Sequence, residues 1–168
     1  VLGMLTQSGK GLCVAGTHGK TTTSTMTAHL LHQSNIGCNA FLGGISKNYG
    51  TNLLLSDNSE YVVIEADEFD RSFLQLFPEI AVITSMDADH LDIYSDISNM
   101  HDAFKAFAGQ VSGTVITKLG LPICQEDTKA DILRYSYDDS KADFFAGNIT
   151  GDECGYFTFD LHWPGGII

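Results

Sequence analysis

The sequence predicts an α/β fold: a mostly parallel sheet flanked by helices, with a P-loop-type phosphate site and a small, partly antiparallel sheet near the C-terminus. Residues 61–65 and 80–84 are continuous apolar runs rather than alternating ones, which favours a parallel sheet covered on both faces. Residues 12–15 form a third short apolar run, and a glycine-rich turn and a helical segment follow it. After about Leu121, shorter segments with hairpin-like breaks predict the antiparallel part.

The N-terminal half is expected to hold two helices and two strands besides the run at 61–65. Residues 2–8 fit a helix that enters the domain, and 12–15 fit a buried strand bounded by glycine. Residues 21–33 predict a helix that ends before Gly37, and 38–42 predict a strand. The following stretch, 43–52, is rich in glycine and polar residues, so we expect a loop there.

The C-terminal half is expected to begin with a helix over residues 98–107. Its apolar side chains Met100, Phe104 and Phe107 recur at helical spacing. Residues 114–117 predict a further strand. The remaining expected strands are 132–137, 143–149 and 156–161, with turns at Asp138-Asp139 and Gly151-Asp152.

Composition limits the possible classes of function. The 168 residues are 43% hydrophobic and 18% charged, as expected for one globular domain with its own core. The net charge of −12 argues against nucleic-acid binding, which needs a basic surface. No run approaches the ~20 apolar residues of a membrane helix. Because Cys13, Cys38, Cys124 and Cys154 show no C-x-x-C spacing, we expect free thiols and a cytoplasmic location.

The most informative stretch is residues 16–23, Gly-Thr-His-Gly-Lys-Thr-Thr-Thr. Its glycines let backbone N–H groups approach phosphate oxygens, and the helix N-terminus adds partial positive charge. Val14 stands where the full Walker A pattern has its first glycine, and an ordinary strand-to-helix turn is the alternative. Lys20 would reach the outer phosphates and the Thr21 hydroxyl would bind Mg²⁺. The predicted ATP-binding residues are Gly16, Thr17, His18, Gly19, Lys20, Thr21 and Thr22.

Two predicted strands end in acidic clusters, at residues 65–70 and 87–92. Ligands bind at the carboxyl ends of the strands in a doubly wound sheet, so both clusters and the glycine-rich loop should meet at one edge. Carboxylates beside a triphosphate repel it unless cations intervene, which implies Mg²⁺. The alternative is a solvated loop, or a helix capped by Asp67 or Asp70.

Taken together, these motifs resemble those of the Mur ligases, the ATP-dependent amide-forming enzymes of peptidoglycan precursor synthesis. His18 stands where most members of that family have asparagine. The members that add L-alanine or recycle murein peptide have histidine there, as this sequence does. The resemblance implies that residues 1–168 are the central ATP-binding domain alone, without the N-terminal UDP-binding and C-terminal domains. The segments that carry it are Gly16-Thr17-His18-Gly19-Lys20-Thr21-Thr22-Thr23, Glu65-Ala66-Asp67-Glu68-x-Asp70-x-Ser72-Phe73 and Asp89-His90-Leu91-Asp92-x-Tyr94.

The resemblance also implies the chemistry. ATP would phosphorylate the carboxylate of UDP-N-acetylmuramate, and the amine of L-alanine would then attack the acyl phosphate. Magnesium is the implied cofactor, and neither nucleic acid nor a membrane is an expected partner. The implied residues are Lys20, Glu65 and His90 for catalysis; Thr21 (or Thr22), Glu65 and His90 for Mg²⁺; and Asn48 and Asn52 for the sugar substrate.

Other functions fit the same residues. A murein-peptide ligase would use a tripeptide in place of L-alanine, and a regulatory ATPase would hydrolyse ATP without an acyl acceptor. Several Mur ligases have a carbamylated lysine after the Asp-His motif, but Lys105 is expected to be a surface lysine here. His29 and His32 are expected on a helix surface or in packing.

Overall fold

The computed structural model describes residues 1–69, 71–87 and 97–168. The helices are α1 (Leu2–Ser8), α2 (Lys20–Gln33) and α3 (Ile97–Gly109), with short 3₁₀ helices η1 (Ser72–Gln75) and η2 (Gln125–Asp127). The strands are β1 (Lys10–Ala15), β2 (Asn39–Ser46), β3 (Thr51–Leu54), β4 (Tyr61–Glu65), β5 (Ile80–Ile83), β6 (Thr114–Lys118), β7 (Asp131–Ser136), β8 (Phe144–Gly151), β9 (Phe157–Trp163) and β10 (Gly166–Ile167).

These strands form one sheet in the order β10-β9-β8-β7-β6-β5-β1-β4-β2-β3. Strand β1 lies in the middle and pairs in parallel with β4 and β5, and the parallel pairing continues to β2 on one side and to β6, β7 and β8 on the other. Strands β3, β9 and β10 are antiparallel to their neighbours. The predicted fold class is therefore confirmed, and the antiparallel strands near the C-terminus continue the main sheet.

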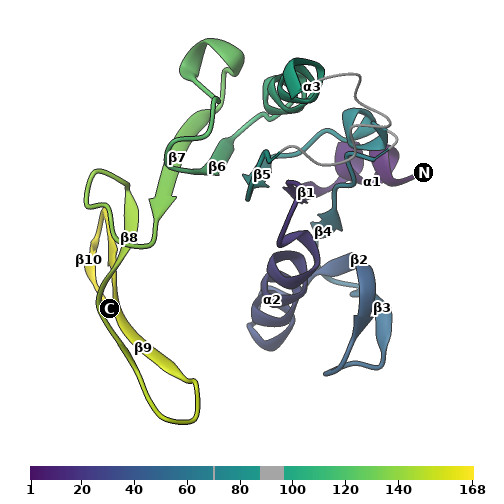
Figure 1. Ribbon diagram of the computed structural model, residues 1–168. Coiled ribbons are helices and arrows are strands. Elements are labelled where there is room, and N and C mark those ends of the chain that lie inside the picture. Colours follow the sequence, from purple (N-terminus) through teal and green to yellow (C-terminus); the bar gives the residue numbers. More distant parts are fainter. Residues whose placement is uncertain (70, 88–96) are drawn as a thin grey trace.

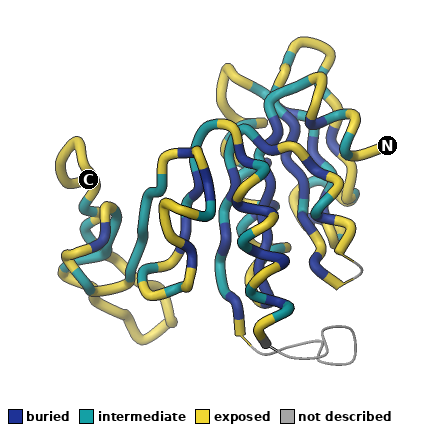
Figure 2. The backbone as a smooth tube through the Cα atoms, turned by 90° about the horizontal axis from the view of Figure 1, so that it is seen from above, coloured by how far each residue is buried: buried dark blue, intermediate teal, exposed yellow. Residues whose placement is uncertain are grey.

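The two faces of the sheet are covered by different helices (Figure 1). Helix α2 packs on one face, where Ala28 meets apolar residues of β2 and β4 such as Ala40 and Val63. On the other face, α3 and η1 bury an aromatic cluster of Phe73, Phe104 and Phe107. Figure 2 shows the buried residues concentrated in the middle of the sheet, whereas the segments near the C-terminus are mostly exposed. No helix in the described part of the chain is long and apolar enough to cross a membrane.

The prediction of a loop over residues 43–52 was right for 47–50, which form a turn, and wrong for 43–46 and 51–52, which belong to strands. Strand β2 continues to Ser46, and β3 begins at Thr51, which pairs with Ser46. Glycine weakens a strand but does not forbid it, and an irregularity in register between Phe41 and Ser46 absorbs the two glycines. The same glycines serve the site described below.

The two predicted turns have different outcomes. Residues Gly151 and Asp152 do begin the turn between β8 and β9, where the Gly155 N–H donates to the Asp152 carbonyl at 3.1 Å. Residues Asp138 and Asp139 also lie at a turn, where the Ala142 N–H donates to the Asp139 carbonyl at 3.1 Å, but this turn connects β7 and β8, which pair in parallel. That connection is therefore not a hairpin.

All four cysteines are free, as predicted; Cys13 and Cys38 are buried and Cys124 and Cys154 are exposed. Burial disfavours the thiolate and raises the pKa of Cys13 to about 12. The Cys124 thiol donates a hydrogen bond to Asp127 Oδ2 at 3.0 Å. This bond to a carboxylate is the main reason that the pKa of Cys124 is raised.

Asp127→Asn is expected to accelerate alkylation of Cys124 by iodoacetamide several-fold at pH 8. The carboxylate stabilises the protonated thiol, so its removal lowers the pKa of Cys124 and increases the thiolate fraction at pH 8. Mass spectrometry of the time course measures the rate at each cysteine, and exposed Cys154 is the internal control. An unchanged ratio of the two rates would contradict the role of Asp127.

Candidate functional site

The glycine-rich loop connects the carboxyl end of β1 to the first turn of α2, between the ends of β4 and β5. After β1 the chain forms β2, β3 and β4 on one side of β1 and then crosses to form β5 on its other side. The carboxyl end of β1 is therefore a topological switch point, where α/β sheets bind ligands. Gly16 and Gly19 have φ values of +135° and +81°, which glycine adopts easily. A Cβ atom on Gly16 would also collide with the Thr84 hydroxyl.

Residues after β5 brace this loop. Ser85 Oγ lies 3.0 Å from Thr17 Oγ1 and accepts from the His18 N–H at 2.8 Å. The Asp87 N–H donates to Thr17 Oγ1 at 3.1 Å. Thr17 is accordingly buried and its hydroxyl faces the protein, whereas the His18 ring is exposed and lies 3.9 Å from the Asp87 carboxylate. Sequence reasoning missed Thr84 and Ser85; the available signal was a pair of hydroxyl residues following a strand next to β1.

The start of α2 presents backbone donors to the same place. The first intrahelical bond runs from the Thr23 N–H to the Gly19 carbonyl, at 3.0 Å. The N–H groups of Lys20, Thr21 and Thr22 precede that bond and belong to the helix end that carries partial positive charge. Thr21 and Thr22 are exposed. This end of the helix is suited to an anionic ligand.

Lys20 reaches back across the loop. Its Nζ donates to the Gly16 carbonyl at 2.8 Å and lies 2.9 Å from each carboxylate oxygen of Glu68. The Glu68 side chain is completely buried, and the Lys20 side chain is 14% exposed. The sequence predicted a phosphate-binding role for Lys20 but not this ion pair.

Glu65 ends β4 directly opposite the start of α2. Its Oε1 accepts from Thr21 Oγ1 at 3.0 Å, and its Oε2 accepts from the Gly43 N–H at 2.9 Å. A Cβ on residue 43 would overlap this carboxylate, so a larger residue there would displace the Glu65 side chain from this position. The structure therefore brings together Thr21 and Glu65, two of the three residues predicted to bind Mg²⁺.

The third predicted magnesium ligand, His90, lies outside the described residues. So do Asp70 and most of the second acidic cluster. Within residues 1–69, 71–87 and 97–168, no group of three or more His, Cys, Asp and Glu side chains could hold a metal ion. The role predicted for His90 stays a prediction.

Two cavities meet at the loop. One, of about 510 Å³, is lined by residues of the loop and of the first turn of α2, together with Glu65, Asp67 and Phe69. The other, of about 650 Å³, extends over β5–β8 and is lined partly by the aromatic rings of Tyr135 and Phe144. His18 and Gly19 line both. A cavity lined by the glycine-rich loop thus adjoins a larger one that is lined partly by aromatic rings.

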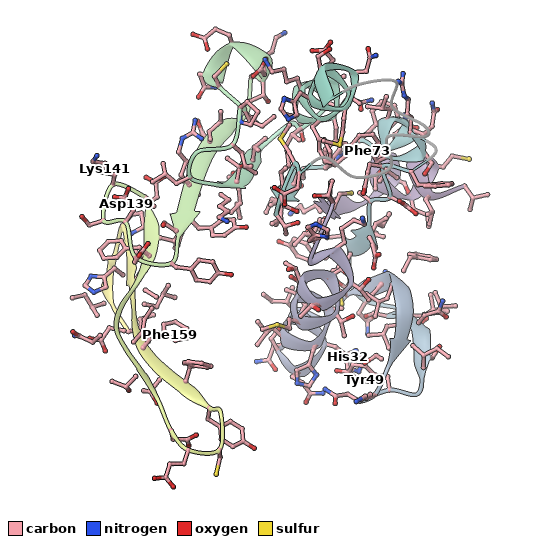
Figure 3. All side chains as sticks on the ribbon, in the orientation of Figure 1. His32, Tyr49, Phe73, Asp139, Lys141 and Phe159 are labelled. Atoms are coloured by element: carbon pink, nitrogen blue, oxygen red, sulfur yellow. The ribbon has the colours of Figure 1, made fainter. Side chains whose placement is uncertain are left out.

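The two asparagines predicted to bind the sugar lie on the β2–β3 hairpin. Asn48 lines a cavity that also borders Thr21 and Thr22, and Asn52 is exposed in β3. Next to Asn48, Tyr49 accepts or donates a 2.8 Å hydrogen bond with His29 Nδ1. The ring of His32 meets Tyr49 edge-on (Figure 3). This confirms that both histidines serve on the helix surface and in packing, with His32 exposed.

Lys105 lies on α3, as predicted. Its side chain is 38% exposed, and its Nζ lies 3.7 Å from Asp127 Oδ1. This confirms the expectation of a surface lysine.

Comparison with known proteins agrees with this geometry. The UDP-N-acetylmuramate–L-alanine ligase of Phocaeicola vulgatus is 62% identical over 100% of this chain, and that of Porphyromonas gingivalis is 53% identical over 100%. The chain spans 37% of the length of each. A crystal structure of the UDP-N-acetylmuramate:L-alanyl-γ-D-glutamyl-meso-diaminopimelate ligase of Neisseria meningitides is also similar, with 25% sequence identity and a TM-score of 0.79. The match covers 96% of this chain and 54% of the Neisseria chain.

The sequence pattern of one family matches residues 14–167, and that family is described as the Mur ligase middle domain. The match covers the glycine-rich loop, both acidic clusters and the C-terminal strands. It confirms the resemblance predicted from the sequence. The chain therefore belongs to the Mur ligase family.

Proposed function

We propose that this chain is the central ATP-binding domain of a cytoplasmic, ATP-dependent ligase that joins L-alanine to UDP-N-acetylmuramate. The observation that carries the proposal is the meeting of Lys20, the N-terminus of α2 and the Thr21–Glu65 pair at one switch point. Positive donors and a hydroxyl–carboxylate pair at one site are what a magnesium–triphosphate complex requires. The 37% share of its relatives' length supports the presence of further domains in the whole protein.

The chain's own residues would hold the nucleotide. The N–H groups at the start of α2 would donate to the phosphate oxygens, since those groups precede the first intrahelical bond. Lys20 would place its charge against the outer phosphates, where negative charge develops during transfer. The exposed ring of His18 borders both cavities and would contact the nucleotide between its phosphates and its nucleoside.

The donor set at Glu65 fits Mg²⁺. A carboxylate and a hydroxyl 3.0 Å apart are hard oxygen ligands, which Mg²⁺ prefers. The Gly43 N–H fixes the second carboxylate oxygen at 2.9 Å, which orients the group. Bound Mg²⁺ would supply neutralisation of phosphate charge, with Thr21 and Glu65 as its ligands and His90 as the further ligand that the family resemblance implies.

The proposed reaction has two steps. A carboxylate oxygen of UDP-N-acetylmuramate attacks the γ-phosphorus of ATP, the bond to the bridging oxygen breaks, and ADP leaves. The neutral amine of L-alanine then attacks the acyl carbon, phosphate leaves, and the amine nitrogen loses a proton as the amide forms. Phosphorylation is needed because a free carboxylate has no adequate leaving group.

L-alanine is favoured over a tripeptide as the second substrate. Relatives that cover the whole chain at 53–62% identity are named as L-alanine ligases, whereas the structure named for a peptide ligase is 25% identical. The predicted sugar-side residues Asn48 and Asn52 lie on the β2–β3 hairpin that carries Gly43, and Asn48 lines a cavity that extends to Thr21 and Thr22. This supports a sugar site on the side of the loop that Glu65 borders.

The test is ADP release by the full-length protein. ADP and amide are expected only when ATP, Mg²⁺, UDP-N-acetylmuramate and L-alanine are all present, with L-alanine outcompeting the tripeptide. Preference for the tripeptide would establish the recycling ligase instead. ADP release that needs no acyl acceptor would establish a regulatory ATPase.

A further inference from the structure

We propose that Glu68 is a positioning residue for Lys20: its buried carboxylate holds the lysine ammonium at the base of the phosphate loop, ready for the outer phosphates of the nucleotide. The inference rests on the proposed function of the loop, and it adds a residue that the nucleotide itself does not contact. Glu68 lies three positions after Glu65, so one short segment after β4 serves both sides of the phosphate site.

The geometry fixes the ammonium from two directions. Gly16 O lies 2.8 Å from Nζ, and each Glu68 oxygen lies 2.9 Å from it. A lysine ammonium has three N–H donors, so engagement of the carbonyl and the carboxylate leaves one for a phosphate oxygen. Lys20 also lines the polar cavity of about 510 Å³. The lysine is therefore already at the cavity wall when the nucleotide arrives.

The segment that carries Glu68 is itself anchored. The Ala66 N–H donates to the Val14 carbonyl at 2.8 Å, and the Phe73 N–H donates to the Asp67 carbonyl at 3.2 Å. Phe73 is completely buried in the aromatic cluster under α3. Because both ends of the segment are tied to the core, the carboxylate can hold a flexible lysine in one place.

Stability alone is a poor reason for this carboxylate. A buried ion pair is often no more stable than well-packed apolar residues of the same volume. A negative charge beside a phosphate site also opposes anion binding, so a compensating benefit is needed. That benefit is the ordering of Lys20 before the nucleotide binds, because the conformational entropy of the long side chain is then not lost on binding.

The experiment is a calorimetric titration of the full-length protein with a non-hydrolysable ATP analogue and Mg²⁺. The variants are Glu68→Gln, which keeps the shape and removes the charge, Lys20→Ala, and the two combined. Glu68→Gln is expected to weaken binding of the analogue about tenfold, because the Lys20 ammonium is no longer held in place by a charged partner. In the Lys20→Ala background the same change is expected to weaken binding no further. Glu153→Gln, an identical change in the exposed β8–β9 turn, is the matched control.

Thermal unfolding separates positioning from folding. Lys20→Ala removes the ammonium from a buried carboxylate and is expected to lower Tm by roughly 10 °C, and the double variant is expected to recover part of that loss. Glu68→Asp keeps the charge but is one methylene shorter, and we expect its affinity to lie between those of Glu68→Gln and the wild type. It also provides the test of binding if Glu68→Gln does not fold.

Two results would overturn the role of Glu68 and leave the proposed function intact. One is binding of the analogue by Glu68→Gln that is as tight as in the wild type or tighter, and the other is an equal loss of affinity from Glu68→Gln with Lys20 present and with Lys20→Ala. Tighter binding would mean that the carboxylate competes with phosphate for Lys20. Failure of the wild-type protein to bind the analogue would overturn the phosphate site itself, and with it the proposed function.

Discussion

Glu65→Gln is expected to lower the turnover of the full-length ligase by about a thousandfold, because metal-assisted charge neutralisation contributes several kcal/mol to a transition state and each ~1.4 kcal/mol is a factor of ten. Glutamine has the same size and can still accept from the Gly43 N–H, which lies 2.9 Å from the carboxylate. What it loses is the negative charge beside Thr21. The variant should therefore fold normally and fail at the magnesium-dependent step.

The measurement is the rate of ADP release against Mg²⁺ concentration at saturating substrates. Glu60→Gln is the matched control, because Glu60 precedes β4 at its opposite end and is 61% exposed in a surface pair with Lys10. Such pairs contribute little to stability or activity. Wild-type turnover and an unchanged Mg²⁺ requirement in Glu65→Gln would remove Glu65 from the metal site.

Phe73→Ala is expected to lower the free energy of unfolding by about 3–5 kcal/mol, the range for truncating a buried phenylalanine. The Phe73 ring is completely buried, stacks on Phe107 at a centroid distance of 5.0 Å and meets Phe104 edge-on at 5.4 Å. Typical domains are stable by only about 5–15 kcal/mol. The loss therefore approaches the stability of a weak domain.

Urea unfolding followed by circular dichroism measures this loss. Phe159→Ala is the control, since Phe159 is 50% exposed on β9, on the hairpin away from the aromatic cluster (Figure 3). Its loss is expected to be well under that of Phe73→Ala. Equal losses at the two positions would show that the cluster under α3 is not the main core.

The parts of the fold that sequence predicts well are those with a local cause. The ranges 61–65 and 80–84 contain uninterrupted apolar runs, 62–64 and 80–83, because parallel central strands are buried on both faces. Each run forms a strand next to β1. The loop and Lys20 were recognisable because phosphate binding needs a strand, glycines and a helix start in that order. Helix α3 followed from its apolar spacing.

The failures have a non-local cause. Composition predicts a loop at Gly43, yet Gly43 lies in strand β2, where the carboxylate of Glu65, 22 residues away, occupies the space that a side chain would take. The Ser85 brace and the Lys20–Glu68 pair join residues 67 and 48 positions apart. No local pattern encodes such partners, because they depend on which strands become neighbours in the sheet.

The bracing of the loop by Ser85 has a consequence for the thermodynamics of ligand binding. Amides held at Thr17 and His18 by bonds of 3.2 and 2.8 Å should exchange slowly with deuterium even in the free protein. A loop that is already ordered has little conformational entropy left to lose when a ligand arrives. Nucleotide binding should then leave the exchange rates of these two amides nearly unchanged, and the heat released should report contacts with the phosphates rather than folding of the loop.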